Sequence, residues 1–416
     1  MERSRNDPMR RVVVTGLGVV TPVGNDVPSF WDSLIQGKSG IDFITRFDTT
    51  DFKVKVAAEV KNFDPLRYFE KSDLRKTDLF CQYAVAAAVQ AMEDSGVAGT
   101  VDGRRMGVYV GSGIGGMETF VAQCEKLSKG GPRKVSPFFI PMMIANIAAG
   151  TIAIRYQAMG PSMSIATACA TSTNTVGEAF RAIQHGDADV MIAGGAEATL
   201  TPLAVAGFTN CMALSTVNDP KRASIPFDKR RDGFVMGEGA GILVLEEYDH
   251  AKARGAKIYA EITGYGNTND AYHMTAPQPD AIGSAEAIRL AVEEAGALKE
   301  GNLYFNAHGT STPLNDKTET LAIKKVFGER AYDLLVSSTK SMTGHMLGAT
   351  GAVEAVASVL ALKEGIVPPT VGYEEPDPEC DLNYVPNQAV KADLQYAASA
   401  SLGFGGHNAC VVFQKV

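Results

Sequence analysis

The feature that most limits the possible folds is an order of helices and strands that occurs twice along the chain. In the first part, a helical pattern over residues 84–96 precedes a strand-like segment over 106–116. In the second part, a helical pattern over 285–296 precedes a strand-like segment over 303–312. Repetition of one order at this spacing indicates two copies of a single structural unit. We therefore expect two similar halves that meet near residues 250–260.

A second pair of segments supports this division. The pattern of residues 163–189 predicts a strand, a tight turn and a helix, and residues 334–365 have the same pattern. Runs of β-branched residues alternate with helix-like stretches in both halves, which is typical of α/β proteins. No linker-like or low-complexity stretch separates independent domains. The sequence therefore predicts an α/β fold divided into halves 1–257 and 258–416.

Composition narrows the class of protein. Of the 416 residues, 45% are hydrophobic and 21% are charged, so the chain is expected to form a globular fold. The formal net charge is −8, from 39 basic and 47 acidic residues, and nucleic-acid-binding proteins usually carry a basic excess instead. No stretch reaches the roughly 20 consecutive apolar residues that a membrane-spanning helix requires. We expect no nucleic-acid partner, no membrane anchor and no secretory signal.

The cysteines point to one candidate nucleophile. There are six, far apart and without a CxxC motif: Cys81, Cys124, Cys169, Cys211, Cys380 and Cys410. This spacing favours free thiols in a reducing compartment, and we expect the cytoplasm. Cys169 stands apart because it follows an apolar strand and precedes small residues that can begin a helix. A helix N-terminus favours a thiolate, whereas the other five cysteines are interpreted as buried and inert.

Two histidines complete a candidate acyl-transfer site. His308 and His345 lie just after predicted strands, in loops rich in Gly, Ser and Thr, where side chains can point into a site. If the halves are pseudo-symmetric, the turn with Cys169 corresponds to the turn with Lys340 and His345. Neutral imidazoles can donate hydrogen bonds to a developing oxyanion or exchange protons. Cys169 with both histidines therefore indicates cysteine-based acyl transfer.

Other ligand classes have weaker support. His308, His345 and His407 offer three metal ligands, but the chain has no HExxH motif and no ligand pair at helical spacing, so we expect no metal. The glycines of 111–116 open no clear helix, and no GxxxxGK[ST] motif occurs, which disfavours nucleotide binding. Residues 403–408 are either a tight turn or a mobile gate around an aromatic side chain.

Four motifs in order resemble one enzyme family over the chain from Arg10 to the C-terminus: TACATS, NAHGTSTPLNDKTE, SSTKSMTGHMLGATGAVE and SLGFGGHN. They closely resemble the elongating β-ketoacyl-acyl carrier protein synthases of type II fatty acid synthesis, and within them the type called synthase II. The resemblance implies a thiolase-like fold whose two pseudo-symmetric halves form a five-layered αβαβα sandwich, and it implies a homodimer. It implies no cofactor, because the substrates carry 4′-phosphopantetheine on acyl carrier protein.

The resemblance also implies residue roles. Cys169 would take the acyl chain from a carrier-protein thioester. His308 and His345 would assist decarboxylation of malonyl-carrier protein, and the resulting carbanion would attack the Cys169 thioester to give a 3-oxoacyl product two carbons longer. Lys340 matches the lysine of the family and is expected to pair with Glu354. Phe404 matches the gate, and its amide would form the oxyanion hole with the amide of Cys169. Thr310 and Thr312 match residues that bind the pantetheine arm. Ile114 and Phe208 match residues that line the acyl pocket.

Acyl carrier protein is acidic, so basic side chains are candidates for its docking surface. These candidates are Lys71, Arg75, Lys76, Arg133 and Lys134. Met212 stands where we expect an arginine in close relatives, which puts part of this surface in doubt. His407 stands where relatives often have threonine, and it has no assigned role.

Several alternatives remain at this point. Synthase I shares the cysteine and both histidines, and motif spacing does not separate it from synthase II. A noncatalytic partner subunit such as a chain-length factor should lack Cys169. A thiolase would use a second cysteine as base, and an initiating synthase would have asparagine in place of one histidine. A cysteine hydrolase would leave the paired histidines and Lys340 without a purpose.

Overall fold

The structure is a computed structural model, and it describes residues 9–299 and 302–416. Within these residues, ten strands form one hydrogen-bonded sheet in the order β10-β9-β13-β14-β8-β1-β7-β6-β4-β5. The strands of the first half are β1 (Val12–Val20), β4 (Met106–Gly111), β5 (Ser162–Met163), β6 (Val190–Glu197) and β7 (Gly239–Glu247). Those of the second half are β8 (Ala260–Asn269), β9 (Leu303–Asn306), β10 (Leu335–Ser337), β13 (Tyr396–Gly403) and β14 (His407–Gln414). Two short pairs lie outside this sheet: β2 (Asp42–Phe43) with β3 (Val56–Ala57), and β11 (Ile366–Val367) with β12 (Val390–Lys391).

The strand order is duplicated across the sheet. The run β5-β4-β6-β7-β1 has the same succession as the run β10-β9-β13-β14-β8. Strand directions repeat as well. β4 and β9 each pair in parallel with both of their neighbours, whereas β7 and β14 each pair antiparallel with both of theirs. β1 and β8 join the two runs through antiparallel pairs at Val12, Val13 and Val14. This duplication confirms that the chain has two pseudo-symmetric halves.

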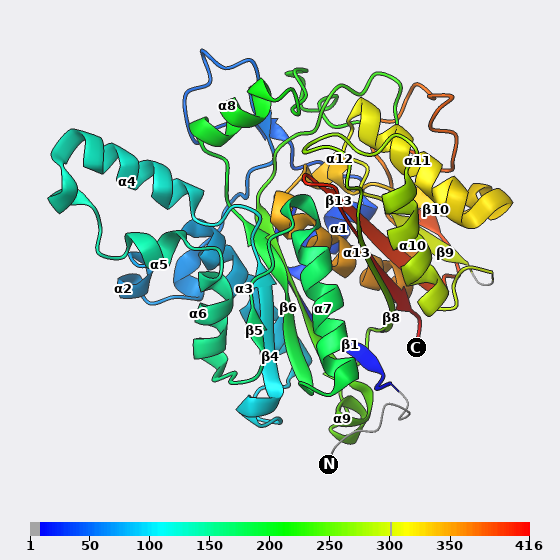
Figure 1. Ribbon diagram of the computed structural model, residues 1–416, viewed down its shortest axis with the longest axis horizontal. Coiled ribbons are helices and arrows are strands. Elements are labelled where there is room, and N and C mark those ends of the chain that lie inside the picture. Colours follow the sequence, from blue (N-terminus) through cyan, green and yellow to red (C-terminus); the bar gives the residue numbers. More distant parts are fainter. Residues whose placement is uncertain (1–8, 300–301) are drawn as a thin grey trace.

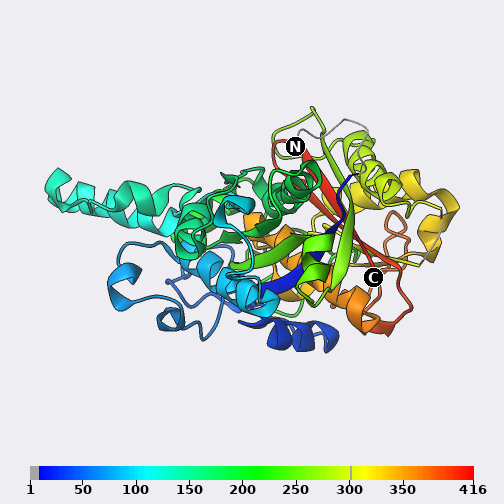
Figure 2. The same ribbon diagram turned by 90° about the horizontal axis from the view of Figure 1, so that it is seen from below.

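Helices cover the outer faces and fill the space between the halves (Figure 1 and Figure 2). On the outer face of the first half, α3 (Leu79–Ser95) packs on β1 and β7, and α6 (Ile147–Tyr156) packs on β4. On the outer face of the second half, α10 (Ile282–Glu294) packs on β8 and β14, with α11 (Pro313–Phe327) beside it. Between them, α7 (Thr171–His185) and α13 (Thr350–Glu364) contact each other and strands of both halves. The arrangement is the expected αβαβα sandwich.

The central position of α13 follows from its sequence. Every residue from Thr350 to Leu362 is buried, and the helix carries one charged residue, Glu354, before its exposed last turn. A helix without a polar face has no side that favours water, so burial on all sides is its stable state. Small residues also permit close approach to α7, because a Cβ atom at Gly351 would lie 2.0 Å from Thr173 Oγ1.

The other helices are short or peripheral. They are α1 (Val27–Ile35), α2 (Lys71–Leu74), α4 (Met117–Gly130), α5 (Phe139–Met143), α8 (Pro202–Asn210), α9 (Tyr248–Ala253) and α12 (Lys340–Thr343). Helix α4 extends away from the body of the protein in both views (Figure 1 and Figure 2). None of the described helices is long and apolar enough to cross a membrane.

Candidate active site

Cys169 lies in a single 3-10 turn, Ala168–Ala170, directly before α7. Its neighbour Ala168 has a φ of +50°, a left-handed conformation that costs energy for a residue with a Cβ atom. The backbone amides of Phe404 and of Cys169 itself lie near enough to the sulfur to act on the pKa of the thiol, and both lower it. The strained turn therefore presents the thiol beneath two amide donors.

Burial changes the expected protonation of this thiol. Cys169 is 8% exposed, and burial raises the pKa of its thiol to about 12, although Lys340 and the two amides act in the opposite direction. The prediction that the helix start favours a thiolate is therefore wrong for the resting protein. Loss of hydration penalises the charged sulfur more than the helix end stabilises it. The prediction that the other cysteines are buried is confirmed for Cys81, Cys380 and Cys410 and is wrong for Cys124 and Cys211, which are exposed.

His308 and His345 lie together within the same site. Their ring centroids are 5.3 Å apart at an interplanar angle of 86°, and both side chains are buried. Burial, assisted by the positive charge of Lys340, lowers both pKa values well below the usual 6.5, so both imidazoles are neutral. His345 Nδ1 lies 3.2 Å from Thr350 Oγ1, while His308 Nδ1 has no hydrogen-bond partner among the described residues.

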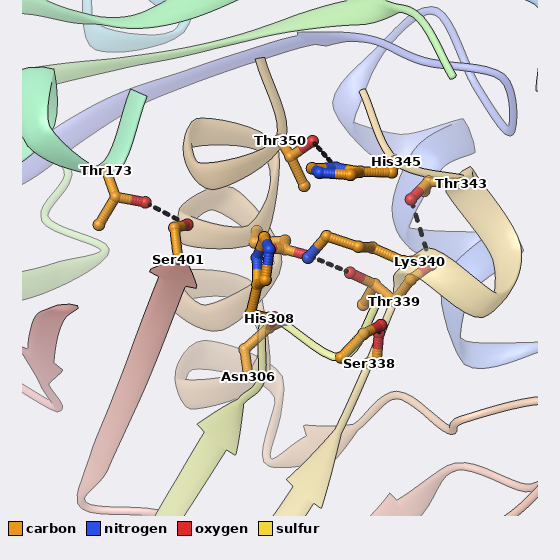
Figure 3. A network of polar contacts seen from close by, with 12 residues as sticks. Thr173, Asn306, His308, Ser338, Thr339, Lys340, Thr343, His345, Thr350 and Ser401 are labelled. Atoms are coloured by element: carbon orange, nitrogen blue, oxygen red, sulfur yellow. Dashed lines mark hydrogen bonds and ion pairs between the residues drawn. The ribbon is translucent and has the colours of Figure 1, made fainter. Parts of the chain in front are cut away.

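Lys340 and Glu354 form a buried ion pair behind the histidines. Lys340 Nζ donates to Glu354 Oε1 at 2.6 Å, and each side chain is 1% exposed, so the expected pairing is present. Figure 3 shows Lys340 projecting toward His308, with His345 beside Thr350 on the other side. Burial raises the pKa of Glu354 to about 7, while Lys340 favours the ionised carboxylate. The lysine charge helps to keep both imidazoles unprotonated.

A cavity of about 390 Å³ brings the predicted residues together. Its walls include Cys169, His308, His345, Thr310, Thr312 and Phe404. The two threonine hydroxyls lie 2.9 Å apart, and Phe404 lies on the turn between β13 and β14. Thiol, imidazoles, hydroxyls and aromatic ring thus line one cavity.

Other predicted residues lie outside this cavity. Phe208 packs on Phe404 and Phe234, with ring centroids 6.5 Å and 5.6 Å apart, so it lies one layer away from the cavity. Ile114 is 38% exposed and does not line the cavity. His407 does not line it either, and the described residues contain no cluster of three His, Cys, Asp or Glu side chains able to hold a metal. Met212 does line the cavity, at its mouth, and is 88% exposed.

The predicted docking residues are all on the surface. Lys71, Arg75 and Lys76 are exposed at α2, and Arg133 and Lys134 are exposed in the turn after α4. Lys134 lines a separate groove of about 660 Å³ beside α4, and none of the five lines the cavity of Cys169. Their exposure permits contact with a partner.

Two buried glutamates near the site were missed from the sequence. Glu319 accepts hydrogen bonds from the amides of His308 and Gly309 at 2.6 Å and 2.7 Å, which fixes the loop that carries the histidine. Glu197, the last residue of β6, accepts from several amides near the turn of Cys169. The only local signal for Glu197 is a carboxylate at the end of an otherwise apolar strand, and no local pattern identifies its partners.

Comparisons with known proteins agree with this geometry. Residues 9–251 match the family "Beta-ketoacyl synthase, N-terminal domain", and residues 259–374 match "Beta-ketoacyl synthase, C-terminal domain". A 3-oxoacyl-[acyl-carrier-protein] synthase 2 of Staphylococcus aureus (strain COL) is 53% identical over 409 residues, which cover 98% of each chain. The protein of that name from Coxiella burnetii (strain RSA 493 / Nine Mile phase I) is 52% identical over 98% of this chain and 99% of its own.

Solved structures show the same fold. The ishigamide ketosynthase/chain length factor superposes with a TM-score of 0.91 at 39% identity, over 98% of this chain and 100% of that chain. A ketosynthase from AntDE:AntF, solved in complex with its type II PKS acyl-carrier protein, has a TM-score of 0.90 at 37% identity, with the same coverage. These neighbours confirm the thiolase-like fold, and the chain belongs to the beta-ketoacyl synthase family.

Proposed function

We propose that this protein is a 3-oxoacyl-[acyl-carrier-protein] synthase of type 2, a condensing acyltransferase that elongates an acyl chain by two carbons. One observation carries the proposal: a cysteine thiol beneath two amide donors shares a cavity with two buried, neutral histidines. Relatives of this name align with the chain over nearly its whole length.

The first step transfers the acyl group to Cys169. The sulfur attacks the carbonyl carbon of an acyl thioester, the amides of Cys169 and Phe404 stabilise the resulting oxyanion, and the carrier thiol leaves. Because the resting thiol is protonated, its proton must leave as the carbon–sulfur bond forms. A neutral imidazole in the same cavity accepts this proton and passes it to the sulfur of the leaving carrier thiol, so that both imidazoles are neutral again before the second step.

The second step forms the new carbon–carbon bond. Malonyl-carrier protein loses carbon dioxide, and the electron pair of the broken bond becomes an enolate. The neutral imidazoles of His308 and His345 donate hydrogen bonds to its oxygen, and one such donor contributes a rate factor of about 10²–10³. The enolate carbon then attacks the Cys169 thioester, the sulfur leaves, and a 3-oxoacyl thioester remains on the carrier protein.

The proposed reaction needs no metal or cofactor of its own. The 4′-phosphopantetheine arm arrives on the substrate, and we assign the hydroxyls of Thr310 and Thr312 to its amide groups because both line the cavity wall. The buried pair of Lys340 and Glu354 keeps positive charge next to the imidazoles without exposing it to substrate.

Acyl carrier protein is the proposed partner. Its acidic surface is complementary to the exposed basic residues of α2 and of the turn after α4, which lie on the same side of the molecule (Figure 1). We also propose a homodimer, because β5 ends the sheet and exposes both of its residues, and an open edge strand favours pairing with a second copy. The cytoplasm is the proposed location, in agreement with six free cysteines.

Two other functions are alternatives to this proposal. Synthase I would carry out the same reaction with a different preference for chain length. A chain-length-factor-like subunit is suggested by the name of one structural neighbour, the ishigamide ketosynthase/chain length factor, but the nucleophile and the histidine pair are both present here. A partner subunit would form no acyl adduct at Cys169.

Mass spectrometry of the full chain with a series of acyl-carrier proteins tests the function. We expect an adduct on Cys169 and, after malonyl-carrier protein is added, a 3-oxoacyl product two carbons longer. Cys169→Ala should form neither. His308→Ala and His345→Ala should form the adduct but condense about 10²–10³-fold more slowly, because each lacks one donor to the enolate. His185→Ala, at the exposed end of α7, is the matched control.

The outcomes separate the alternatives. An adduct that is only hydrolysed would indicate a hydrolase, and the absence of any adduct would indicate a noncatalytic subunit. Loss of condensation with long acyl chains alone would favour synthase I over synthase II.

A further inference from the structure

A fully buried carboxylate with no assigned role lies beside the turn of the nucleophile. Glu197 Oε2 accepts hydrogen bonds from the amides of Gly113 and Gly348, at 2.9 Å and 3.0 Å. Its Oε1 accepts from Ser112 Oγ at 2.9 Å and from the amide of Ile114 at 3.3 Å. Four donors from two chain segments, one in each half, therefore converge on one side chain that is 0% exposed.

The two chain segments that donate to Glu197 lie on either side of its carboxylate, next to the turn that carries Cys169. The first is the loop after β4 that carries Ile114, and the second is the 3-10 turn Leu347–Ala349. The two segments approach closely, because a Cβ atom at Gly348 would lie 2.4 Å from the Gly113 amide, and Gly113 is in van der Waals range of the Ala168 carbonyl. Movement of either segment would require a change in the hydrogen bonds of Glu197.

The Leu347 turn is part of the apolar region around Cys169, and the Ile114 loop packs against that turn through Gly113. Cys169 belongs to one buried cluster with Leu200, Leu214, Phe234 and Leu347. Leu347 has a φ of +46°, so its turn is held in a strained conformation. Because we assign the cavity with Thr310 and Thr312 to the pantetheine arm, the buried apolar cluster is the space that we assign to the acyl chain on Cys169.

We propose that Glu197 is a positioning residue that sets the acyl-chain length, because it anchors the Ile114 loop and the Leu347 turn beside the acyl path. The inference rests on the proposed function, since only an acyl group on Cys169 uses this path. Glu197 touches no reacting atom, and it acts through the two segments that it joins.

The hydrogen-bond pattern means that Glu197→Gln should release one of the two segments, the Ile114 loop, and retain the other. An amide NH₂ group cannot replace Oε2, because two backbone N–H donors point at that position. The glutamine oxygen must therefore occupy this position, and its NH₂ group faces Ser112 and Ile114. The Ser112 hydroxyl can rotate to accept a hydrogen bond, whereas the Ile114 N–H has no acceptor left. The variant keeps the bridge between the halves and releases the Ile114 loop.

Glu247→Gln is a matched control. Glu247 is also a buried glutamate at the end of a strand, and its side chain accepts from the amide of His250. Glu197 pairs with Gly239 at the start of β7, whereas Glu247 is the last residue of β7, at the opposite end of the same strand pair. Its replacement removes a similar charge far from Cys169.

The experiment measures condensation rates of the full chain with short, medium and long acyl-carrier proteins. For Glu197→Gln we expect the ratio of long-chain to short-chain rate to rise about tenfold, the size of a typical pocket discrimination, with the short-chain rate retained. Glu247→Gln should have the wild-type ratio. A wild-type ratio in Glu197→Gln, or equal losses at all chain lengths, would overturn the proposal.

A second variant covers the case in which Glu197→Gln does not fold. Ser112→Ala removes a donor to the same Oε1 and retains the carboxylate, so we expect a smaller shift of the ratio in the same direction. An unchanged ratio in this variant would also count against the proposal. Failure of the wild-type protein to condense at any chain length would contradict the proposed function instead, and so the two failures are distinguishable.

Discussion

At Cys169, burial and hydrogen bonding act in opposite directions on one atom. The amides of Cys169 and Phe404 and the charge of Lys340 lower the pKa of the thiol, but burial of the sulfur raises it by a larger amount. The same amide donors remain in place for the oxyanion of the acyl-transfer step, where they stabilise charge on oxygen. We therefore propose that the sulfur loses its proton as it attacks, because the raised pKa favours the thiol in the resting protein.

The pH dependence of Cys169 alkylation tests this state. Because the pKa is raised to about 12, the thiolate fraction should increase about tenfold per pH unit and should still be rising above the ordinary cysteine pKa of about 8.5. Iodoacetamide labelling of the peptide that contains Cys169, followed by mass spectrometry, measures the rate. A plateau near neutral pH would show that the amides and Lys340 outweigh burial.

At the scale of secondary structure, Asp78 joins two helices. Its side chain accepts from the amide of Phe80 and so caps α3, and it also accepts from the amide and hydroxyl of Thr119 in the first turn of α4. Helix α4 otherwise extends away from the body (Figure 1). One buried carboxylate therefore fixes the direction in which α4 leaves the first half.

Asp78→Ala should weaken both helix starts. We expect a loss of about 1–2 kcal/mol in the free energy of unfolding, together with faster hydrogen exchange in α4. Asp26→Ala is the comparison, because Asp26 caps α1 alone through the amide of Ser29. Exchange in α4 that is equally slow in both variants would show that Asp78 does not hold this helix.

The element boundaries show where sequence patterns are informative. The helix predicted over 84–96 is part of α3, and the helix predicted over 285–296 overlaps α10. The strand-like segments 106–116 and 303–312 end early, at Gly111 and Asn306. Beyond those points the chain turns into loops whose amides bond to Glu197 and Glu319 instead of to a neighbouring strand.

At the scale of the whole molecule, the two halves share one central layer. α7 comes from the first half and α13 from the second, and each contacts strands of both. Tight contact between them depends on Gly351, where a Cβ atom would lie 2.0 Å from Thr173 Oγ1 and 2.8 Å from the Thr173 amide. We propose 257/258 as the boundary between the halves, and we expect them to unfold in one cooperative transition.

A pair of glycine substitutions tests this central contact. Gly351→Ala should lower the free energy of unfolding of both halves by about 1–3 kcal/mol, because the methyl group separates α7 from α13. Gly150→Ala, in α6, meets no atom within 4 Å and should stabilise the protein by about 0.5–1 kcal/mol. Denaturant unfolding followed by circular dichroism measures both. Separate transitions for the two halves, or a neutral Gly351→Ala, would contradict the shared layer.

The duplicated order of strands and helices, and the set of Cys169, His308 and His345, can be predicted from the amino-acid sequence alone. Periodicity, turn residues and motif order are local properties, so they can be identified without knowledge of the fold. The distant groups that surround these residues are identified only in the folded structure. The protonation of Cys169 depends on its burial, and the four donors to Glu197 come from positions up to 151 residues away. Burial and long-range hydrogen bonds arise only when both halves pack around α7 and α13, and no local pattern encodes their balance.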